Sequence, residues 1–167
     1  MLLDAGHPDC ADQVIGYLKD LGITKIDYFV ASHPHIDHIG AFPKIAETFE
    51  IGKAYRSYVE YTTQTYQNYV NALEEHNIPV EYLKAGDEIP FGDQITVKIY
   101  NPEEEIEYPK DFPKGSTAFL NNHSLAMKFI YGESTVLFCG DLYTAAERSL
   151  VEQYGEELQA DVVKANH

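Results

Sequence analysis

The hydrophobic pattern of the chain changes its period near Gly86, and this change restricts the folds that the chain can adopt. Before Gly86, short apolar runs that suit buried strands alternate with apolar stripes of helical spacing. The expected strands cover residues 2–5, 26–32 and 51–56, and the expected helices carry their stripes at residues 14–21, 42–49 and 66–73. Strands that alternate with helices are typical of a layered α/β fold.

After Asp87 the pattern becomes that of β-strands. Alternating apolar residues at 95–99 predict one strand. Residues 125–131 and 134–139 predict a hairpin that turns at Gly132-Glu133. This part of the chain is therefore expected to form an antiparallel or mixed sheet.

Three further segments complete the pattern. Residues 101–120 carry three prolines and a run of glutamates, which predicts one long irregular loop that either shapes a substrate pocket or is a solvated surface excursion. Thr144 and Glu147 have the spacing of a capping box for a last helix through Tyr154. Residues 160–164 predict a final strand.

Length and composition favour a single domain over residues 1–167. The chain has 167 residues, of which 44% are hydrophobic, so it can bury one sizeable core. No apolar run approaches the roughly 20 residues of a membrane helix, and Leu3 leads straight into Asp4 rather than into a secretory signal. We expect a soluble chain, either in the bacterial cytoplasm or as the extracellular part of a longer protein.

The acidic composition and the two cysteines limit the partners of the chain. With 27 acidic and 12 basic residues the net charge is −15, which disfavours nucleic acid and favours a small-molecule or cationic substrate. Cys10 and Cys139 lie far apart in the sequence. Because Cys139 falls in an apolar run, a buried thiol is favoured over a disulfide.

Three histidines and an aspartate gather within six residues, immediately after a predicted strand, as His33-x-His35-x-Asp37-His38. Imidazole nitrogens and carboxylate oxygens are ligands that Zn²⁺ accepts, and four ligands so close in sequence do not fit one tetrahedral ion comfortably. The spacing therefore indicates two adjacent metal ions. The alternative, solvated loop histidines, suits the isolated His76 better than this cluster.

The motif H-x-H-x-D-H at the end of a strand is the hallmark of the metallo-β-lactamase superfamily, which the chain resembles over essentially its whole length. Leu3-Asp4-Ala5-Gly6 is similar to the family's opening strand and turn, and Cys139-Gly140-Asp141 to its Gly-Asp motif. Val163-Lys164-Ala165-Asn166-His167 is similar to its terminal histidine segment. The resemblance implies a four-layer αββα sandwich with the metal ions at one edge of its two sheets.

Carried over to this sequence, the family pattern makes His33 and His35 ligands of one metal ion and Asp37 and His38 ligands of the other. Asp141 would bridge the two ions. The ions would be divalent, with zinc as the first choice and manganese or iron as alternatives.

Three more residues take roles from the same resemblance. His167 would complete the second site, a role that a histidine following it in the native gene could share. His123, within Asn121–Ser124, is the candidate third histidine of the first ion, or else a proton donor facing the pocket. Asp4 is expected to hold the metal loop by hydrogen bonds, as metal ligands commonly require, with a turn-forming aspartate as the alternative.

Within the superfamily, the segments around residues 86–102, 121–124 and 164–167 resemble the hydrolase domain of bacterial competence proteins and the phosphorylcholine esterases. Both groups act on phosphodiesters. The tyrosine-rich stretch 55–69 could stack on a base or enclose a choline, although Tyr66 and Tyr69 fit a helical core stripe better. The family normally has further strands and helices at both ends, so we expect a truncated domain.

The resemblance implies a hydrolase in which a hydroxide held between two metal ions attacks a phosphodiester. Asp37 would hold one ion, Asp141 would position the hydroxide, and His123 or a water would protonate the leaving oxygen. Acyl, thioester or lactam hydrolysis is one alternative, and a non-catalytic metal-binding regulatory module is another. The complete motif together with Asp141 favours catalysis.

Overall fold

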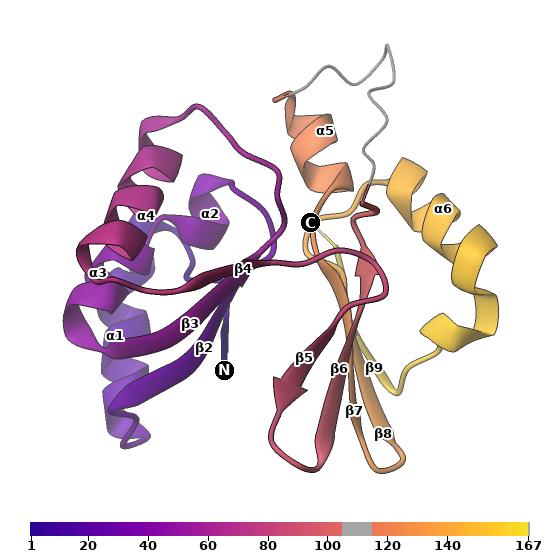
Figure 1. Cartoon of the computed structure of the whole chain (residues 1–167), viewed down its shortest axis with the longest axis horizontal. Helices are drawn as coiled ribbons and strands as arrows, with labels where there is room; N and C mark the ends of the chain where they lie inside the picture. The colour runs from indigo at the N-terminus through magenta and orange to yellow at the C-terminus, as the bar shows by residue number, and fades with distance from the viewer. Residues whose placement is uncertain (105–114, 167) are drawn as a thin grey trace. The chain divides into compact units, whose positions relative to one another are not determined.

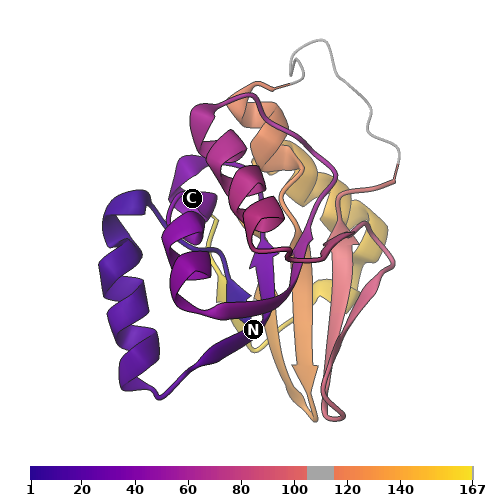
Figure 2. The same cartoon turned by 60° about the vertical axis from the view of Figure 1, so that its left-hand side comes forward.

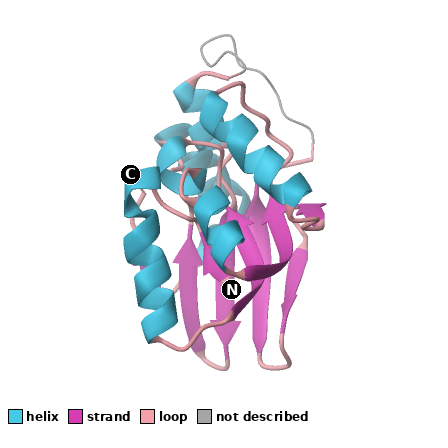
Figure 3. Ribbon diagram, turned by 90° about the vertical axis from the view of Figure 1, so that its left-hand side faces the viewer, coloured by secondary structure: helices cyan, strands magenta, loops and turns pink. Residues whose placement is uncertain are grey.

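The computed structural model describes residues 1–104 and 115–166. It divides into two compact units, unit 1 over Met1–Tyr82 and unit 2 over Leu83–His167. Each unit is built around its own β-sheet, and Figure 1 and Figure 3 show its helices and strands. Within the described residues, no helix has the length and apolar character that crossing a membrane requires.

Unit 1 contains a parallel sheet, sheet A, whose strands follow one another in chain order. The strands are β1 (Leu2–Leu3), β2 (Lys25–Ala31), β3 (Glu50–Arg56) and β4 (Val80–Tyr82). The helices are η1 (Pro8–Cys10), α1 (Ala11–Asp20), α2 (Ile36–Ile39), α3 (Phe42–Thr48) and α4 (Gln64–Glu75). The predicted alternation of strands and helices is confirmed, and β4 and the short α2 are additions to it.

The core of unit 1 lies between sheet A and its helices. Indigo α1, purple α3 and magenta α4 lie side by side in Figure 2. Phe29 of β2 packs on Phe42 of α3, with ring centroids 4.4 Å apart. Tyr66 and Tyr69 are both buried in this core, which confirms the helical stripe predicted for α4. In α1, however, Tyr17 of the predicted stripe is 65% exposed.

Unit 2 contains sheet B, in which neighbouring strands are antiparallel except for the parallel pair β8 and β9. The strands are β5 (Glu88–Phe91), β6 (Ile95–Asn101), β7 (Ala126–Tyr131), β8 (Ser134–Phe138) and β9 (Val162–Lys164). The helices are α5 (Thr117–Asn122), α6 (Thr144–Tyr154) and η2 (Gly155–Leu158). The mixed sheet, the hairpin and the last strand are confirmed.

One local prediction in unit 2 is wrong and another holds only in part. The N-cap of α6 is Tyr143, and no side chain caps the helix there, so Thr144 and Glu147 do not form a capping box. The irregular loop predicted for residues 101–120 is interrupted by α5, whose N-cap Ser116 accepts a hydrogen bond from the Phe119 amide. Residues 105–114 of that loop lie outside the described residues.

A small core on sheet B supports α6. Leu150 of this helix packs with Tyr100, Ala126, Leu137 and Cys139. The prediction that Cys139 is a core residue is confirmed, since it is 8% exposed and its thiol is free, as is that of the exposed Cys10. Burial raises the pKa of the Cys139 thiol to about 11, so it is protonated at neutral pH.

Candidate metal centre

The candidate site residues of unit 1 lie at the carboxyl ends of the strands of sheet A. Because all its strands are parallel, their carboxyl ends lie together, and polar loops that follow them share that edge. The register pairs Leu3 with Val30 and Ala31 with Arg56. Asp4 and Ser32, which follow the ends of the neighbouring strands β1 and β2, are thereby brought within hydrogen-bonding distance although 28 residues separate them in the sequence.

The His33-x-His35-x-Asp37-His38 motif is a strand-to-helix connection. After β2 the chain is extended at His35, which is the N-cap of α2, and the His38 amide donates to the His35 carbonyl at 3.0 Å. His33 and His38 are buried, His35 is half-buried and Asp37 is exposed. The sequence predicted a polar loop here. The structure has the short helix α2 instead, in which His38 and Ile39 are buried.

Asp4 is the anchor of this connection. One carboxylate oxygen accepts the Ser32 amide at 2.7 Å, and the other accepts the Ser32 hydroxyl and His38 Nδ1, each at 2.8 Å. Asp4 has a φ of +56°, a left-handed conformation that aspartate tolerates better than most residues. The hydrogen bonds expected from Asp4 to the loop are therefore present. They hold the loop to the end of β1.

These hydrogen bonds determine which ring nitrogens carry lone pairs. His38 donates from Nδ1 to Asp4, so its lone pair is on Nε2. The Ser32 hydroxyl gives its proton to Asp4 and lies 3.1 Å from His33 Nδ1. It therefore accepts from that nitrogen, and the lone pair of His33 is also on Nε2. A ligand histidine whose other nitrogen donates to a carboxylate or hydroxyl is the usual arrangement in metal sites.

The donor atoms of the motif converge in two pairs. His33 Nε2 lies 2.9 Å from His35 Nδ1, and His38 Nε2 lies 3.5 Å from Asp37 Oδ2. Two nitrogen ligands of one tetrahedral Zn²⁺ ion are roughly 3.3 Å apart, given Zn–N bonds of about 2.0 to 2.1 Å. The residues of unit 1 therefore fit divalent metal ions. The assignment of these residues to two separate ions stays a prediction.

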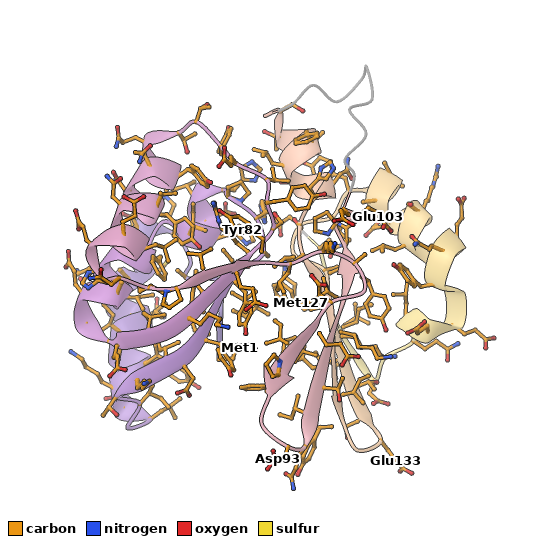
Figure 4. All side chains as sticks on the ribbon, in the orientation of Figure 1. Met1, Tyr82, Asp93, Glu103, Met127 and Glu133 are labelled. Carbon is orange, nitrogen blue, oxygen red and sulfur yellow. The ribbon has the colours of Figure 1, made fainter. Side chains whose placement is uncertain are left out.

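The candidate residues of unit 2 lie at one end of sheet B. Asp93 and Glu133 mark the two hairpin turns at the opposite end (Figure 4). Since β8 runs away from the turn at Glu133, Asp141 follows at the far end. His123 lies there too, because β7 begins at that end. Sheet pairing therefore gathers residues that come from separate turns.

His123 is held in a single orientation. It ends α5, and its Nδ1 donates to the Phe119 carbonyl at 2.6 Å, which leaves the lone pair on Nε2. Its ring also packs on the Phe119 ring at a centroid distance of 4.2 Å. Burial lowers the pKa of His123, so the ring is neutral at pH 7. A neutral imidazole in this orientation offers an Nε2 lone pair, and whether His123 binds a metal ion stays a prediction.

Asp141 is buried, and unit 2 holds it from two sides. Its amide donates to the Ser124 hydroxyl at 3.3 Å. Lys164, at the end of β9, donates to the Gly140 carbonyl at 2.7 Å and to Asp141 Oδ1 at 3.2 Å. Lys164 was not among the site residues predicted from the sequence, where its only signal is a basic residue at the end of an apolar strand. His167 lies outside the described residues.

Comparison with known families identifies the class of protein. The sequence model of the metallo-β-lactamase superfamily matches residues 1–161, so the chain belongs to this superfamily, as the motif predicted. A curated relative is a UPF0173 protein of Pyrococcus abyssi, 27% identical over 137 residues. The match covers 78% of this chain, which spans 61% of the length of that relative.

Solved structures confirm the fold. The metallo-β-lactamase SMB-1 matches with a TM-score of 0.60 at 14% identity, over 98% of this chain and 67% of that one. A HARLDQ-motif mutant of a Cronobacter sakazakii metallo-β-lactamase gives 0.59 at 15% identity, over 98% and 66%. Rubredoxin oxygen:oxidoreductase of Desulfovibrio gigas gives 0.51 at 21% identity, over 90% and 36%. The chain therefore has the metallo-β-lactamase fold predicted from its sequence, and the fold is shared by proteins of different activities.

Proposed function

We propose that this chain is a metal-dependent hydrolase that uses two divalent ions, zinc in the first place and manganese or iron as alternatives. His33 and His35 would hold one ion, and Asp37 and His38 the other. The observation that carries the proposal is the network around Asp4, in which Asp4 and Ser32 leave the Nε2 lone pairs of His33 and His38 for ligation. A merely solvated histidine loop would not need buried imidazoles in fixed tautomers.

The proposal assigns the remaining ligands to unit 2. Asp141 would bridge the two ions, His123 would complete the first set and His167 the second. Support comes from the order of the motifs along the chain and from the superfamily match, which extends over both units. The fixed Nε2 lone pair of His123 and the tethered carboxylate of Asp141 suit these roles.

When bound, the two ions would polarise the substrate and lower the pKa of a bound water. The protein's own residues would keep the site in order. Asp4 maintains the tautomers of the ligand loop through its three hydrogen bonds. Lys164 donates to one oxygen of Asp141, and this contact would hold the carboxylate in one orientation when it positions the attacking group.

We propose a phosphodiester as the substrate class, either a small phosphodiester or a phosphorylcholine-type ester. The support is the resemblance of residues 121–124 and 139–141 to competence-protein hydrolase domains and phosphorylcholine esterases. The net charge of −15 disfavours long nucleic acids, because the acidic protein repels each phosphate of the backbone. Acyl, thioester or lactam hydrolysis and a non-catalytic metal module are the competing outcomes.

The test combines metal analysis with a substrate panel on the full-length gene product. Elemental analysis after zinc or manganese loading should give close to two ions per chain, and folded protein with none would reject the proposal. Rates on chromogenic phosphodiesters, phosphorylcholine esters, thioesters and lactams should be highest for the first two. A preference for thioester or lactam would contradict the substrate class, and metal binding without turnover would indicate the regulatory module.

A further inference from the structure

A small cavity lies at the carboxyl edge of sheet A, within unit 1. Its volume is about 10 Å³, which is close to the space that one water molecule occupies. The residues that line it include Ala31, His33, Arg56, Tyr66 and Tyr69. None of the roles proposed for the metal ligands accounts for Arg56 or Tyr69, so the cavity needs an explanation of its own.

Arg56, the last residue of β3, brings a buried positive charge to this cavity. It is only 8% exposed. One of its terminal nitrogens donates to the Tyr66 hydroxyl and the other to the Tyr82 hydroxyl, the latter at 2.9 Å. The guanidinium also stacks over both rings, 5.5 Å from the Tyr66 centroid and 4.9 Å from that of Tyr82. Its Nε atom is buried and makes no hydrogen bond to a described residue.

The charge of Arg56 is not balanced by a carboxylate. Among residues 1–104 and 115–166, no acidic side chain forms an ion pair with it. Its close neighbours are phenol hydroxyls, and an arginine side chain does not lose its proton in proteins. Burying a charge without a partner costs several kcal/mol, so such groups are almost always paired. An anion in the cavity would supply the missing partner.

Tyr69 provides a second donor on the same cavity. Its side chain is 1% exposed, and its hydroxyl forms no hydrogen bond within the described residues. Burial raises the pKa of this hydroxyl, so it keeps its proton and can donate. His33 also lines the cavity, and its Nδ1 is engaged with Ser32. A water could accept from the two donors, but it would leave the charge of Arg56 unbalanced.

We propose that Arg56 and Tyr69 form an anion-binding site that takes one water-sized anionic atom. That atom is a halide ion or a terminal oxygen of an oxyanion such as phosphate. The site lies next to the metal loop, because His33 and Pro34 line the same cavity. The proposal goes beyond the hydrolase activity and stands independently of it, since it uses only Arg56, Tyr69 and the cavity between them.

The test measures anion-dependent stability on the metal-loaded protein at constant ionic strength. The midpoint of thermal unfolding is compared in sodium bromide, sodium phosphate and sodium gluconate, whose carboxylate is carried by a polyol chain much bulkier than a phosphate ion. A ligand at ten times its Kd raises the midpoint of a domain of this size by about 3 to 6 °C. We expect this rise for the wild-type protein in bromide or phosphate. The rise should be lost in Arg56→Met and reduced in Tyr69→Phe.

Lys53→Met is the matched control. Lys53 lies on the same strand as Arg56, and the substitution removes one positive charge from a surface ion pair with Glu81. Lys53→Met should keep the full rise in the midpoint. A rise that also persists in Arg56→Met would come from anions bound at the metal ions. A rise in bromide alone identifies a halide site, and a rise in phosphate alone identifies an oxyanion site. An equal midpoint in all three salts would overturn the proposal.

Should Arg56→Met fail to fold, crystals of the wild-type protein grown in sodium bromide keep the proposal open to refutation. Bromide gives an anomalous signal that water does not. A peak within hydrogen-bonding distance of Arg56 Nε and the Tyr69 hydroxyl supports a halide site. Water in the cavity of both bromide-grown and phosphate-grown crystals would overturn the proposal.

Discussion

Sheet A and sheet B bring functional side chains together in different ways. In unit 1 every strand is parallel, so one edge collects the residues that follow β1, β2 and β3. In unit 2 the strands β5 to β8 alternate in direction and β9 runs parallel to β8, and the candidate residues come from the start of β7 and the ends of β8 and β9. Sheet A presents its candidate ligands on one contiguous loop held by Asp4, whereas sheet B collects its candidate residues from three separate segments.

This comparison has an energetic consequence. The ligand loop of unit 1 is held by three hydrogen bonds to a single carboxylate, that of Asp4. In unit 2, Asp141 depends on Ser124, which precedes β7, and on Lys164 at the end of β9. Disruption of unit 1 should therefore act on metal binding itself, while disruption of unit 2 should act first on local stability.

The largest effect is expected for Asp37→Ala and His38→Ala in the ligand loop. Each should lower the metal content by one ion per chain and reduce hydrolysis at least about a thousandfold, because a metal ion stabilises the transition state by several kcal/mol. Elemental analysis and steady-state rates measure both effects. Asp12→Ala, which removes an exposed carboxylate paired with Lys44, is the control. Wild-type rates in both loop variants would rule out the two-metal mechanism.

A smaller effect is expected for Asp4→Asn. The amide preserves the size of the side chain but loses its charge and one acceptor oxygen, so the tautomers of His33 and His38 are no longer enforced. Loss of such a partner weakens metal affinity about 10- to 100-fold. Competition with a chromogenic chelator measures the affinity, with Asp12→Asn as the matched variant. Unchanged affinity would show that the loop is organised without Asp4.

In unit 2, Lys164→Met should lower the unfolding free energy of the metal-free protein by about 1 to 2 kcal/mol, because a buried carboxylate loses a charged donor. The expected loss of stability is modest because the Lys164 side chain is 39% exposed and water screens its attraction to Asp141. Urea denaturation in chelator measures the change. Lys164→Arg should recover part of the loss. Lys98→Met, which removes a looser pair at 3.6 Å, should cost less than about 0.5 kcal/mol, and an equal loss in both would remove the special role of Lys164.

The smallest effect concerns the two thiols. At pH 8 a thiol reagent should label Cys10, which is exposed, and spare Cys139, whose pKa burial raises to about 11, because the thiolate is the reactive form. Labelling of Cys139 should follow global unfolding in urea. Cys10→Ser should change the unfolding free energy by less than about 0.5 kcal/mol. Rapid labelling of two thiols per folded chain would contradict the packing of Leu150 and Cys139 on sheet B.

Much of the fold could be predicted because the periodicity of long elements is a local property. The stripe through Tyr66 and Tyr69 predicted a helix with a buried face, and both residues lie in the core. Short elements carry too few residues for a periodic signal, so α2 and β4 were missed. The capping box failed because Thr144 already lies inside α6, and extended Tyr143 occupies the cap position.

The candidate site residues also differ in whether they carry a local sequence signal. The four residues of the ligand loop were predictable because they are adjacent in sequence, and Asp4 because the family motif includes it. Arg56 and Lys164 were not, since a single basic residue at a strand end has no spacing that distinguishes it from a surface charge. His167 and residues 105–114 lie outside the described structure, so the roles suggested for them are still predictions.

The superfamily, the ligand loop and the change of hydrophobic period near Gly86 could be recognised from the sequence, because each is carried by motifs or patterns of neighbouring residues. The tertiary structure decided which nitrogen of His33 and His38 carries the lone pair, through hydrogen bonds that reach across 28 and 34 residues. It also decided the burial of Arg56 and its contacts with tyrosines from α4 and β4. Such contacts depend on strand pairing and packing, which bring together residues that have no fixed spacing in sequence.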